Sequence, residues 1–240
     1  MNLKSSRGKL YLIPTRIGDN PPLEVLPLSI KKVIERLNTY IVENEKTARR
    51  FIKRISPNKS QSSLSFYLLN KYTNPGDMTS FLDVCETGES IGIISEAGCP
   101  GIADPGAEIV KIAHEKNIQV VPLVGPSSIL LALMSSGMNG QNFTFNGYLP
   151  IDKSERKTEL KRLERLSFEK KQSQLFIETP YRNDQMMRDI CKCLHLGTRV
   201  CVATDLTLPS EFIKTKTVVE WKKHTVDLHK RPTLFIIQKD

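Results

Sequence analysis

The sequence predicts an α/β fold built from two successive α/β units, and three observations point to it. Short apolar segments typical of strands alternate with segments whose apolar residues recur at helical spacing. Loops rich in Gly and Pro follow several of the strand-like segments, as they do at the ligand-binding edge of an open parallel sheet. With 240 residues, the chain can bury one large core or two small ones. Such alternation is typical of a mostly parallel sheet covered by helices.

In the first half of the chain the predicted elements are joined by short links. Residues 9–14 are an apolar run that ends in a proline, which is typical of a strand. Residues 118–124 are expected to be a buried strand, and residues 60–72 fit neither pattern clearly. The other expected strands are 39–42 and 91–94, and the expected helices are 29–37, 45–55, 77–86, 107–116 and 129–135.

The second half has more strand-like segments and shorter links, so its sheet is expected to be mixed. A charged helix begins at Ser154, a plausible N-cap, and carries Leu160, Leu163 and Leu166 on one side. A further helix is expected at 183–194, and strands at 174–178, 199–204, 217–221 and 233–238. We place an N-terminal domain at residues 1–124 and a C-terminal domain at residues 125–240, with a ligand site between them.

The most informative segment is the loop SEAGCPGIADPG, residues 95–106, between a predicted strand and a predicted helix. Its three glycines let the backbone bend and approach a ligand closely, and its two Pro-Gly pairs favour turns. The phosphate-binding patterns G-x-x-x-x-G-K-S/T and G-x-G-x-x-G are absent from the sequence. We therefore expect a compact ligand held by backbone groups rather than through a triphosphate; an elaborate structural turn is the alternative.

Two further loops carry polar groups in similar positions. Gly125-Pro-Ser-Ser128 joins a strand to a helix, where Ser127 or Ser128 can cap the helix or bind a ligand carboxylate. Glu178 and Arg182 follow another strand and suit the rim of a site, although a surface turn explains them too. The four histidines are scattered without a metal-ligand or triad arrangement, so no metal is expected.

The cysteines and the charge narrow the class of protein. The five cysteines lack metal-ligand spacing, and Cys85, Cys191 and Cys201 lie in apolar contexts typical of small core residues. No apolar signal segment or membrane-spanning run is present, so a reduced, cytoplasmic protein is expected. The net charge of +9 indicates an anionic partner such as nucleic acid. Basic residues gather in two runs, each also compatible with a solvated helix face: Lys46, Arg49, Arg50, Lys53, Arg54 and Lys59, and Lys153, Arg156, Lys157, Lys161, Arg162 and Arg165.

Five motifs occur in order along nearly the whole chain: LYLIPTRIG (10–18), SEAGCPGIADPG (95–106), VPLVGPSS (121–128), FTFNGYLP (143–150) and FIETPYR (176–182). Together they resemble the tetrapyrrole methylase superfamily, and within it the small-subunit ribosomal RNA 2′-O-ribose methyltransferase branch. The resemblance implies two α/β domains with S-adenosylmethionine in the cleft between them, and a homodimer. The cofactor-binding positions that it implies are Pro14, Ile17, Gly18, Ser95, Ala97, Gly98, Cys99, Ile102, Ser127, Ser128, Glu178, Tyr181, Leu206, Pro232, Thr233 and Leu234.

The chain departs from that branch in its first half. Cys99 stands where the superfamily often has Asp and the branch has Thr. Residues 43–46 read ENEK where the branch carries EDTR, and SFYLLN at 65–70 replaces a His-rich segment. We expect substrate contacts in this half, so these departures concern the RNA target and leave the fold and the cofactor unchanged.

The resemblance implies an S-adenosylmethionine-dependent methyltransferase that modifies a ribose 2′-hydroxyl of small-subunit ribosomal RNA and releases S-adenosylhomocysteine. The protein must hold donor and acceptor in line, exclude water and take up the hydroxyl proton. Glu43 matches the branch's acidic motif at a strand end and is the first candidate for the general base; Glu178 and Glu96 are alternatives. The residues expected to contact RNA phosphates are Lys46, Arg49, Arg50 and Arg54.

Two other functions remain compatible with the sequence. The shared fold allows methylation of a small tetrapyrrole or corrin intermediate, which a porphyrinoid-induced absorbance change would favour. The divergent N-terminal motifs allow a non-catalytic protein that binds S-adenosylmethionine or RNA, which cofactor binding without methyl transfer would favour.

Overall fold

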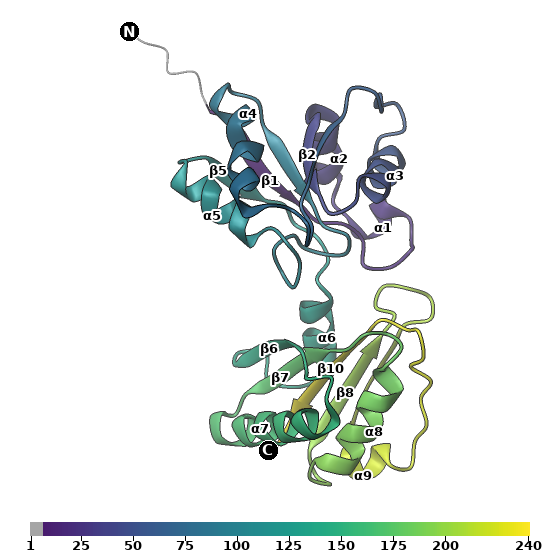
Figure 1. Ribbon diagram of the computed structural model, residues 1–240. Helices are drawn as coiled ribbons and strands as arrows, with labels where there is room; N and C mark the ends of the chain where they lie inside the picture. Colours follow the sequence, from purple (N-terminus) through teal and green to yellow (C-terminus); the bar gives the residue numbers. More distant parts are fainter. Residues whose placement is uncertain (1–6) are drawn as a thin grey trace. The chain divides into compact units, whose positions relative to one another are not determined.

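The computed structural model describes residues 7–240, which form two compact units (Figure 1). Unit 1 ends at Ser127 and unit 2 spans Ser128–Asp240. The sequence-based expectation placed this boundary after residue 124, and residues 1–6 of its first domain lie outside the described residues. Within residues 7–240, no helix is both long and apolar enough to cross a lipid bilayer.

Unit 1 contains a five-stranded, fully parallel sheet in the order β3-β2-β4-β1-β5. Its central strands are apolar on both sides, as expected for a parallel sheet covered by helices. The strands are β1 (Lys9–Ile13), β2 (Thr39–Val42), β3 (Ser65–Leu68), β4 (Ile91–Ile94) and β5 (Gln119–Pro122). The helices are α1 (Pro22–Val25), α2 (Leu28–Arg36), α3 (Glu45–Ile55), the 3₁₀ helix η1 (Pro75–Leu82), α4 (Asp83–Glu86) and α5 (Ala107–Glu115).

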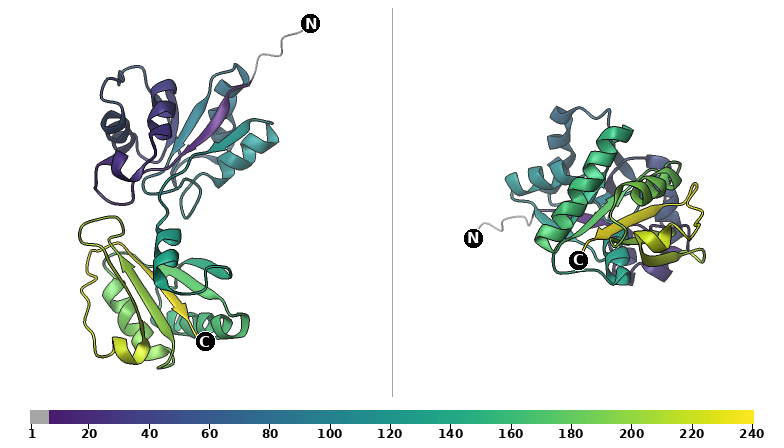
Figure 2. Two further views of the ribbon diagram at one scale, coloured as in Figure 1. Left: turned by 180° about the vertical axis from the view of Figure 1, so that it is seen from behind. Right: turned by 90° about the horizontal axis from the view of Figure 1, so that it is seen from below.

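Each face of this sheet carries its own core, because successive residues of a strand point to opposite faces. Tyr40 and Val42 pack with α1, α2 and α3, whereas Ile41 between them packs with η1, α4 and α5. Figures 1 and 2 show these two groups of helices on opposite sides of the sheet. The helices cover the two faces of the sheet, and the loops lie at the carboxyl edge of its parallel strands.

Unit 2 contains a mixed five-stranded sheet in the order β6-β7-β10-β8-β9. Strands β6 and β7 are parallel, and the other three neighbouring pairs are antiparallel, as the shorter links predicted. The strands are β6 (Phe143–Tyr148), β7 (Ser173–Ile177), β8 (Arg199–Thr204), β9 (Phe212–Thr217) and β10 (Thr233–Gln238). The helices are α6 (Ser128–Ser136), α7 (Lys153–Lys170), α8 (Asn183–Cys193) and α9 (Val218–Trp221).

One face of the second sheet is covered by α7, α8 and α9. Phe176 and Phe235 stack on this face with their ring centroids 5.7 Å apart, within the same apolar core as Trp221. Helix α6 packs on the opposite face, where the Thr215 hydroxyl donates to the Ser136 carbonyl at 2.7 Å.

Two predicted elements in the chain are wrong, one in kind and one in burial. Residues 217–221 were expected to be a strand, but Val218–Trp221 is a helix and the strand precedes it as β9. Thr217 and Glu220 form a capping box, which overrides the strand preference of the two valines between them. Residues 118–124 were expected to be a buried strand, but β5 is an edge strand in which Gln119 and Pro122 are exposed and the two valines between them are half-buried. The segment 77–86 is helical as predicted, as a 3₁₀ helix up to Leu82 and as α4 from Asp83.

Smaller corrections concern single residues. Asp152, and not Ser154, caps α7, because its carboxylate accepts hydrogen bonds from the amides of Ser154 and Glu155. Cys191 is half-buried, while Cys85 and Cys201 are core residues as predicted. Arg156 belongs to a basic run, but it is buried against Asp189 instead of lying on a solvated face.

Candidate functional site

In unit 1, the loops that follow β1, β4 and β5 meet at the carboxyl edge of the sheet. The Thr15 amide donates to the Gly98 carbonyl at 2.9 Å, and the Ser95 hydroxyl donates to the same oxygen at 2.5 Å. The Cys99 thiol lies 3.4 Å from the Pro126 carbonyl oxygen, which joins the main loop to the third loop. Burial raises the pKa of Cys99, so its thiol serves as a donor and packing group.

Two glycines permit the close packing of these loops. A Cβ atom on Gly125 would lie 2.2 Å from the Cγ atom of Pro14, which is too short for two carbon atoms that are not bonded to each other. Gly98 has a φ of +78°, and a Cβ there would approach Ile17 to 3.3 Å and the Pro126 carbonyl oxygen to 3.4 Å. Both glycines therefore set the distance between neighbouring loops.

Three carboxylates gather at the ends of β2 and β4. Val42 pairs with Ile94, so Glu43 and Glu96, which follow these strands, lie at the same edge. The Thr47 hydroxyl donates to Glu96 Oε1 at 2.6 Å. Burial, a hydrogen bond with Glu43 and the negative charges of Glu43 and Glu96 raise the pKa of Asp104 to about 8. This cluster can therefore hold a proton near neutral pH.

Asp104 was not among the site residues predicted from the sequence, although it lies in the main loop, residues 95–106. Its neighbour Ala103 has a φ of +57°, which is unusual for a residue other than Gly or Asn and turns the loop at this point. A carboxylate beside two Pro-Gly pairs was the available signal. Only the folded loop brings Asp104 to Glu43, because 61 positions separate them in the chain.

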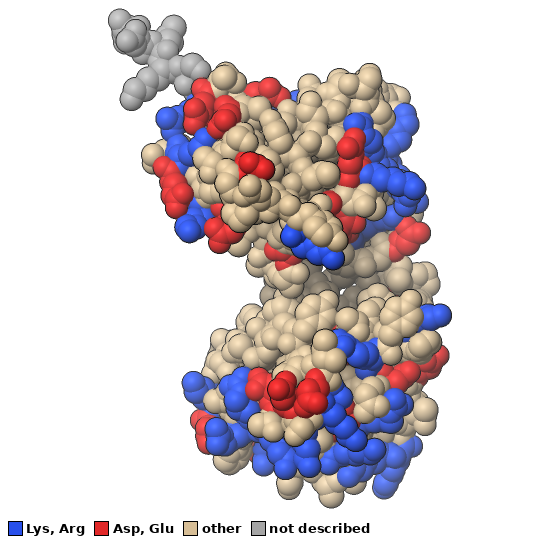
Figure 3. Space-filling model, viewed as in Figure 1, with Lys and Arg blue, Asp and Glu red and all other residues tan. Residues whose placement is uncertain are grey.

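The four residues expected to bind RNA phosphates lie on α3, in a region where Figure 3 shows several Lys and Arg side chains. Arg49 is engaged with Glu45, at 2.7 Å between Nη2 and Oε1, and Arg54 pairs with Asp19 at 3.0 Å. Lys46 and Arg50 are exposed. The charges of Lys46 and Arg50 are therefore more accessible than those of Arg49 and Arg54.

In unit 2, a second group of loops meets at one edge of the sheet. Strands β7 and β8 end where the antiparallel β10 begins, since Ile177 pairs with Leu234 and Thr204 with Thr233. The Asp205 amide donates to the Pro232 carbonyl at 3.0 Å. The structure thus brings together the predicted positions on the loops after β7 and β8 and before β10.

Backbone conformation and an ion pair hold this second group in place. Asp205, Thr207 and Lys230 have φ values of +52°, +72° and +61°, a left-handed conformation that costs about 1–3 kcal/mol per residue outside glycine. Arg231 Nε donates to Asp205 Oδ2 at 2.8 Å. Strained backbone of this kind is concentrated at functional sites, which supports a role for these loops.

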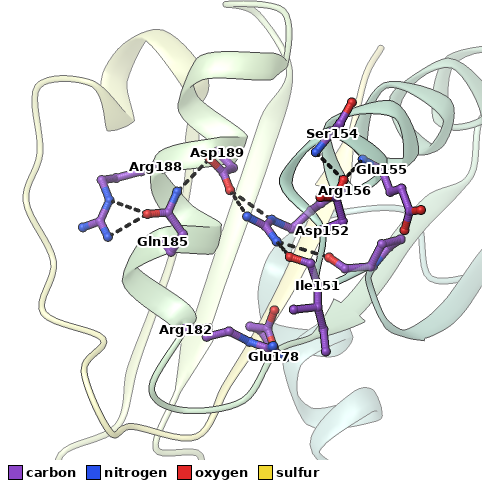
Figure 4. A network of polar contacts seen from close by, with 11 residues as sticks. Ile151, Asp152, Ser154, Glu155, Arg156, Glu178, Arg182, Gln185, Arg188 and Asp189 are labelled. Atoms are coloured by element: carbon purple, nitrogen blue, oxygen red, sulfur yellow. Dashed lines mark hydrogen bonds and ion pairs between the residues drawn. The ribbon is translucent and has the colours of Figure 1, made fainter.

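Glu178, an alternative candidate for the general base, is already engaged by its own loop. Its Oε1 accepts from the Thr179 amide at 2.6 Å and from Arg182 Nη2 at 2.6 Å. Figure 4 shows Arg182 beside Glu178. Only 5% of Glu178 is exposed. This carboxylate therefore stabilises the loop and is poorly placed to accept a substrate proton.

The remaining predicted cofactor positions differ in what they expose. Leu206, Thr233 and Leu234 are buried, so only their backbone groups could reach a ligand. Tyr181 is 71% exposed and Ile102 54% exposed, so each offers apolar surface. The other positions are exposed or half-buried: Ala97, Pro232, Ile17, Gly18, Ser127 and Ser128. Residues 7–240 contain no group of three or more His, Cys, Asp or Glu side chains arranged to hold a metal ion.

Comparison with known proteins agrees with this arrangement. The family model for tetrapyrrole (corrin/porphyrin) methylases matches residues 32–221. The solved structure of the methyltransferase CobJ has a TM-score of 0.62 at 13% identity, covering 97% of this chain and 94% of that one. Cobalt precorrin-4 methyltransferase has a TM-score of 0.59 at 15% identity, covering 96% and 94%. At such identities these two structures support the fold alone.

Curated relatives share more sequence. Ribosomal RNA small subunit methyltransferase I of Leptospira borgpetersenii is 32% identical over 212 residues, covering 87% of this chain and 79% of the relative. The protein of that name from Bacillus subtilis is 31% identical, with 89% and 69% covered, and that of Buchnera aphidicola is 26% identical, with 99% and 80% covered. This chain therefore belongs to the tetrapyrrole methylase family of methyltransferases, as its ordered motifs predicted.

Proposed function

We propose that this protein transfers a methyl group from S-adenosylmethionine to a ribose 2′-hydroxyl of small-subunit ribosomal RNA. The observation that carries the proposal is the similarity, over most of the chain, to relatives named for methylation of that RNA. The loops at the carboxyl edge of the first sheet support it, because they combine close backbone packing with a proton-holding carboxylate cluster.

The loop residues fit S-adenosylmethionine. Arg16 is the only basic residue in the loops 14–18, 95–106 and 123–127, and its guanidinium is engaged with Asp19 and the Asn20 carbonyl. A ligand without phosphates suits such loops. Ala97 and Ile102 offer exposed apolar surface, and backbone amides and carbonyls supply the polar contacts. When bound, S-adenosylmethionine supplies the methyl group from its sulfonium.

We propose that both groups of loops contribute to binding this cofactor. In unit 1 the contacts come from Pro14 to Gly18, Ser95 to Ile102, Ser127 and Ser128. In unit 2 they come from the ETPYR loop, from Leu206 and from Pro232 to Leu234. The Glu178–Arg182 pair keeps the ETPYR loop in shape and leaves Tyr181 exposed to contact a ligand.

The carboxylate cluster is the proposed acceptor of the ribose hydroxyl proton. Glu43 is the first candidate and Glu96 the alternative, while Asp104 shares a hydrogen bond with Glu43. A ribose hydroxyl is a weak acid, so removing its proton in the transition state lowers the barrier. Thr47 orients Glu96 through the hydrogen bond that its hydroxyl donates to Glu96 Oε1.

Basic side chains on α3 are proposed to neutralise RNA phosphates. Lys46 and Arg50 are the exposed members of this group, and they lie within two turns of Glu43 in the sequence. The short distance along the chain links phosphate binding to the proposed proton acceptor. The cytoplasm, where small ribosomal subunits are found, is the proposed place of action.

We further propose a homodimer, supported by exposed apolar side chains in unit 2. Leu130 and Met134 on α6 are 54% and 77% exposed, and Tyr148 and Ile151, at and beyond the end of the edge strand β6, are 61% and 72% exposed. Exposed apolar surface next to an unpaired strand edge is typical of a protein–protein contact. Light scattering on the purified protein tests this.

The test is methyl transfer from labelled S-adenosylmethionine to small ribosomal subunits that lack the modification. Label in the RNA at a ribose 2′-oxygen is expected, whereas label in a porphyrinoid but not in RNA would indicate the tetrapyrrole reaction instead. Glu43→Gln should lower turnover by about 10²-fold or more while S-adenosylmethionine affinity stays within twofold. Glu108→Gln removes an exposed carboxylate of the same unit as a control. Wild-type turnover of Glu43→Gln would remove Glu43 from the role.

A further inference from the structure

Unit 2 contains a groove that the proposed methyl transfer does not use. It has a volume of about 820 Å³ and lies between α8 and residues 221–227, which include the end of α9. This size is within the range of about 300–1,000 Å³ that is usual for ligand sites. Met187, Cys191, Trp221 and Val226 provide apolar lining and also pack against the core of unit 2.

The rim of the groove is basic. Arg188, Lys192 and Lys222 line it and are exposed, together with His224. Lys222 acts across the groove on the Cys191 thiol, since its charge opposes the rise in the pKa of Cys191 that burial causes. Figure 3 shows Lys and Arg side chains crowded over the part of unit 2 that carries α8 and α9 in Figure 1.

The acidic residues of the groove are engaged by the backbone. Asp184 Oδ1 accepts from the Leu228 amide at 3.1 Å, and Asp227 Oδ1 accepts from the His229 amide at 3.0 Å. The whole of unit 2 contains 19 Lys and Arg against 13 Asp and Glu, which is most of the excess positive charge of the chain. The groove is therefore suited to an anionic ligand.

One basic side chain, Arg188, ends a network of polar contacts that begins at a buried ion pair (Figure 4). Arg156 donates to Asp189 Oδ2 at 2.7 Å from Nη2 and 2.9 Å from Nε, and both side chains are buried. Asp189 Oδ1 accepts from Gln185 Nε2 at 2.8 Å, and Gln185 Oε1 in turn accepts from Arg188 Nη2 at 3.0 Å. A fixed guanidinium at the rim loses less entropy on binding a phosphate than a free one.

The wall that faces α8 is also fixed. Trp221 Nε1 donates to the Val200 carbonyl on β8 at 2.8 Å, and the Leu228–Asp184 bond ties the following segment to α8. The groove is thus formed before any ligand binds. A flat apolar group fits the lining, and a phosphate fits the basic rim.

We propose that this groove binds a nucleotide of single-stranded RNA, with the base on the apolar lining and the phosphate on Arg188, Lys192 and Lys222. Stacking and phosphate contacts together are the usual means of holding unpaired RNA. The inference rests on the proposed function, since it gives the RNA substrate a second point of attachment on unit 2. An acidic protein segment or a second copy of the chain are the competing occupants.

The experiment uses Trp221, the only tryptophan of the chain, as a reporter. A short oligouridylate is titrated into the full-length protein while tryptophan fluorescence and RNA anisotropy are followed. Lys192→Glu/Lys222→Glu should weaken RNA binding at least 10-fold and lower the slope of log K against log salt by about 1.4. Lys153→Glu/Lys170→Glu makes the same change of charge on α7 and should alter the affinity less than threefold.

Several outcomes would overturn the inference. They are an equal loss of RNA affinity in the groove variant Lys192→Glu/Lys222→Glu and in the α7 variant, no loss of RNA affinity in the groove variant, or a changed oligomeric state of the groove variant with unchanged RNA affinity. Lys192→Gln/Lys222→Gln, which adds no negative charge, should give a smaller loss if phosphate contact is the cause, and circular dichroism checks its folding. An oligomer with abasic sites should bind at least threefold more weakly; equal binding would refute the stacking of a base.

The same proteins separate this inference from the proposed function. If RNA quenches the tryptophan fluorescence of the wild-type protein but the protein methylates no ribosomal RNA, only the proposed function is contradicted. If a groove variant binds and methylates RNA like the wild type, only the proposal that the groove binds RNA is contradicted. S-adenosylmethionine affinity should be equal in all variants, because no substitution lies in the loops assigned to the cofactor.

Discussion

Gly125→Ala tests whether contact between loops shapes the proposed cofactor site of unit 1. The added Cβ would lie 2.2 Å from Cγ and 2.4 Å from Cβ of Pro14, whereas carbon atoms in contact are usually about 3.5–4.0 Å apart. The two loops must therefore separate by roughly 1 Å or more. Overpacking of this kind costs about 1–3 kcal/mol, and a displacement of about 1 Å in a site can reduce the rate about 100-fold.

We expect Gly125→Ala to weaken S-adenosylmethionine binding at least 10-fold in isothermal titration calorimetry, since Pro14 belongs to the proposed binding loop. Gly140→Ala is the matched control, because a Cβ at Gly140 meets nothing within 4 Å. The control should bind like the wild type. If Gly125→Ala binds the cofactor normally while unfolding at the wild-type urea midpoint, the contact between these loops does not shape the site.

Three further substitutions test other parts of the structure. The pKa of Asp104 is raised to about 8 from an ordinary 3.8, so its contribution to stability is full below pH 4 and is lost as the pH rises towards 8. In urea unfolding at pH 5 and 8.5, Asp104→Asn should reduce this pH-dependent loss of stability by about 1–2 kcal/mol, a value discounted for solvent access. An unchanged pH dependence in the variant would contradict this prediction. Arg156→Met leaves Asp189 buried without its cation and should lower the free energy of unfolding by about 3–5 kcal/mol. Much of this loss should be recovered in Arg156→Met/Asp189→Leu. A loss below 1 kcal/mol in the single variant would show that the ion pair does not stabilise the unit. Thr217→Ala removes the capping box with Glu220 and should cost about 1 kcal/mol in thermal unfolding, whereas no change would show that α9 does not depend on its cap.

Most strands and helices could be predicted because local pattern and tertiary environment agree there. The run at β4 is apolar throughout and that at β2 is apolar after Thr39, and both strands are buried on both faces. The prediction was wrong where one side-chain interaction decides the conformation. Thr217 and Glu220 turn a strand-like sequence into a helix, and burial of β5 depends on its place at the sheet edge, which its own sequence does not encode.

The candidate site divides in the same way. The Gly and Pro residues of the main loop, the lack of a phosphate-binding pattern and the ordered motifs were visible in the sequence, and they indicated the family and the cofactor class. The engagement of Glu178 by Arg182 was not visible, although the two residues are four positions apart. Which of several polar groups at strand ends are free to react depends on their hydrogen bonds.

The sequence by itself determined the fold class, the order of the elements and the methyltransferase family, because these depend on periodicity and on short motifs of fixed spacing. Only the tertiary structure decided which charged groups meet. Asp104 and Glu43 are brought together by the parallel pairing of β2 with β4 and by the fold of the loop that follows β4, and the pairing of Arg156 with Asp189 joins α7 to α8. Electrostatic and steric contacts depend on distances of a few ångströms between residues far apart in the chain, and no local pattern specifies those distances.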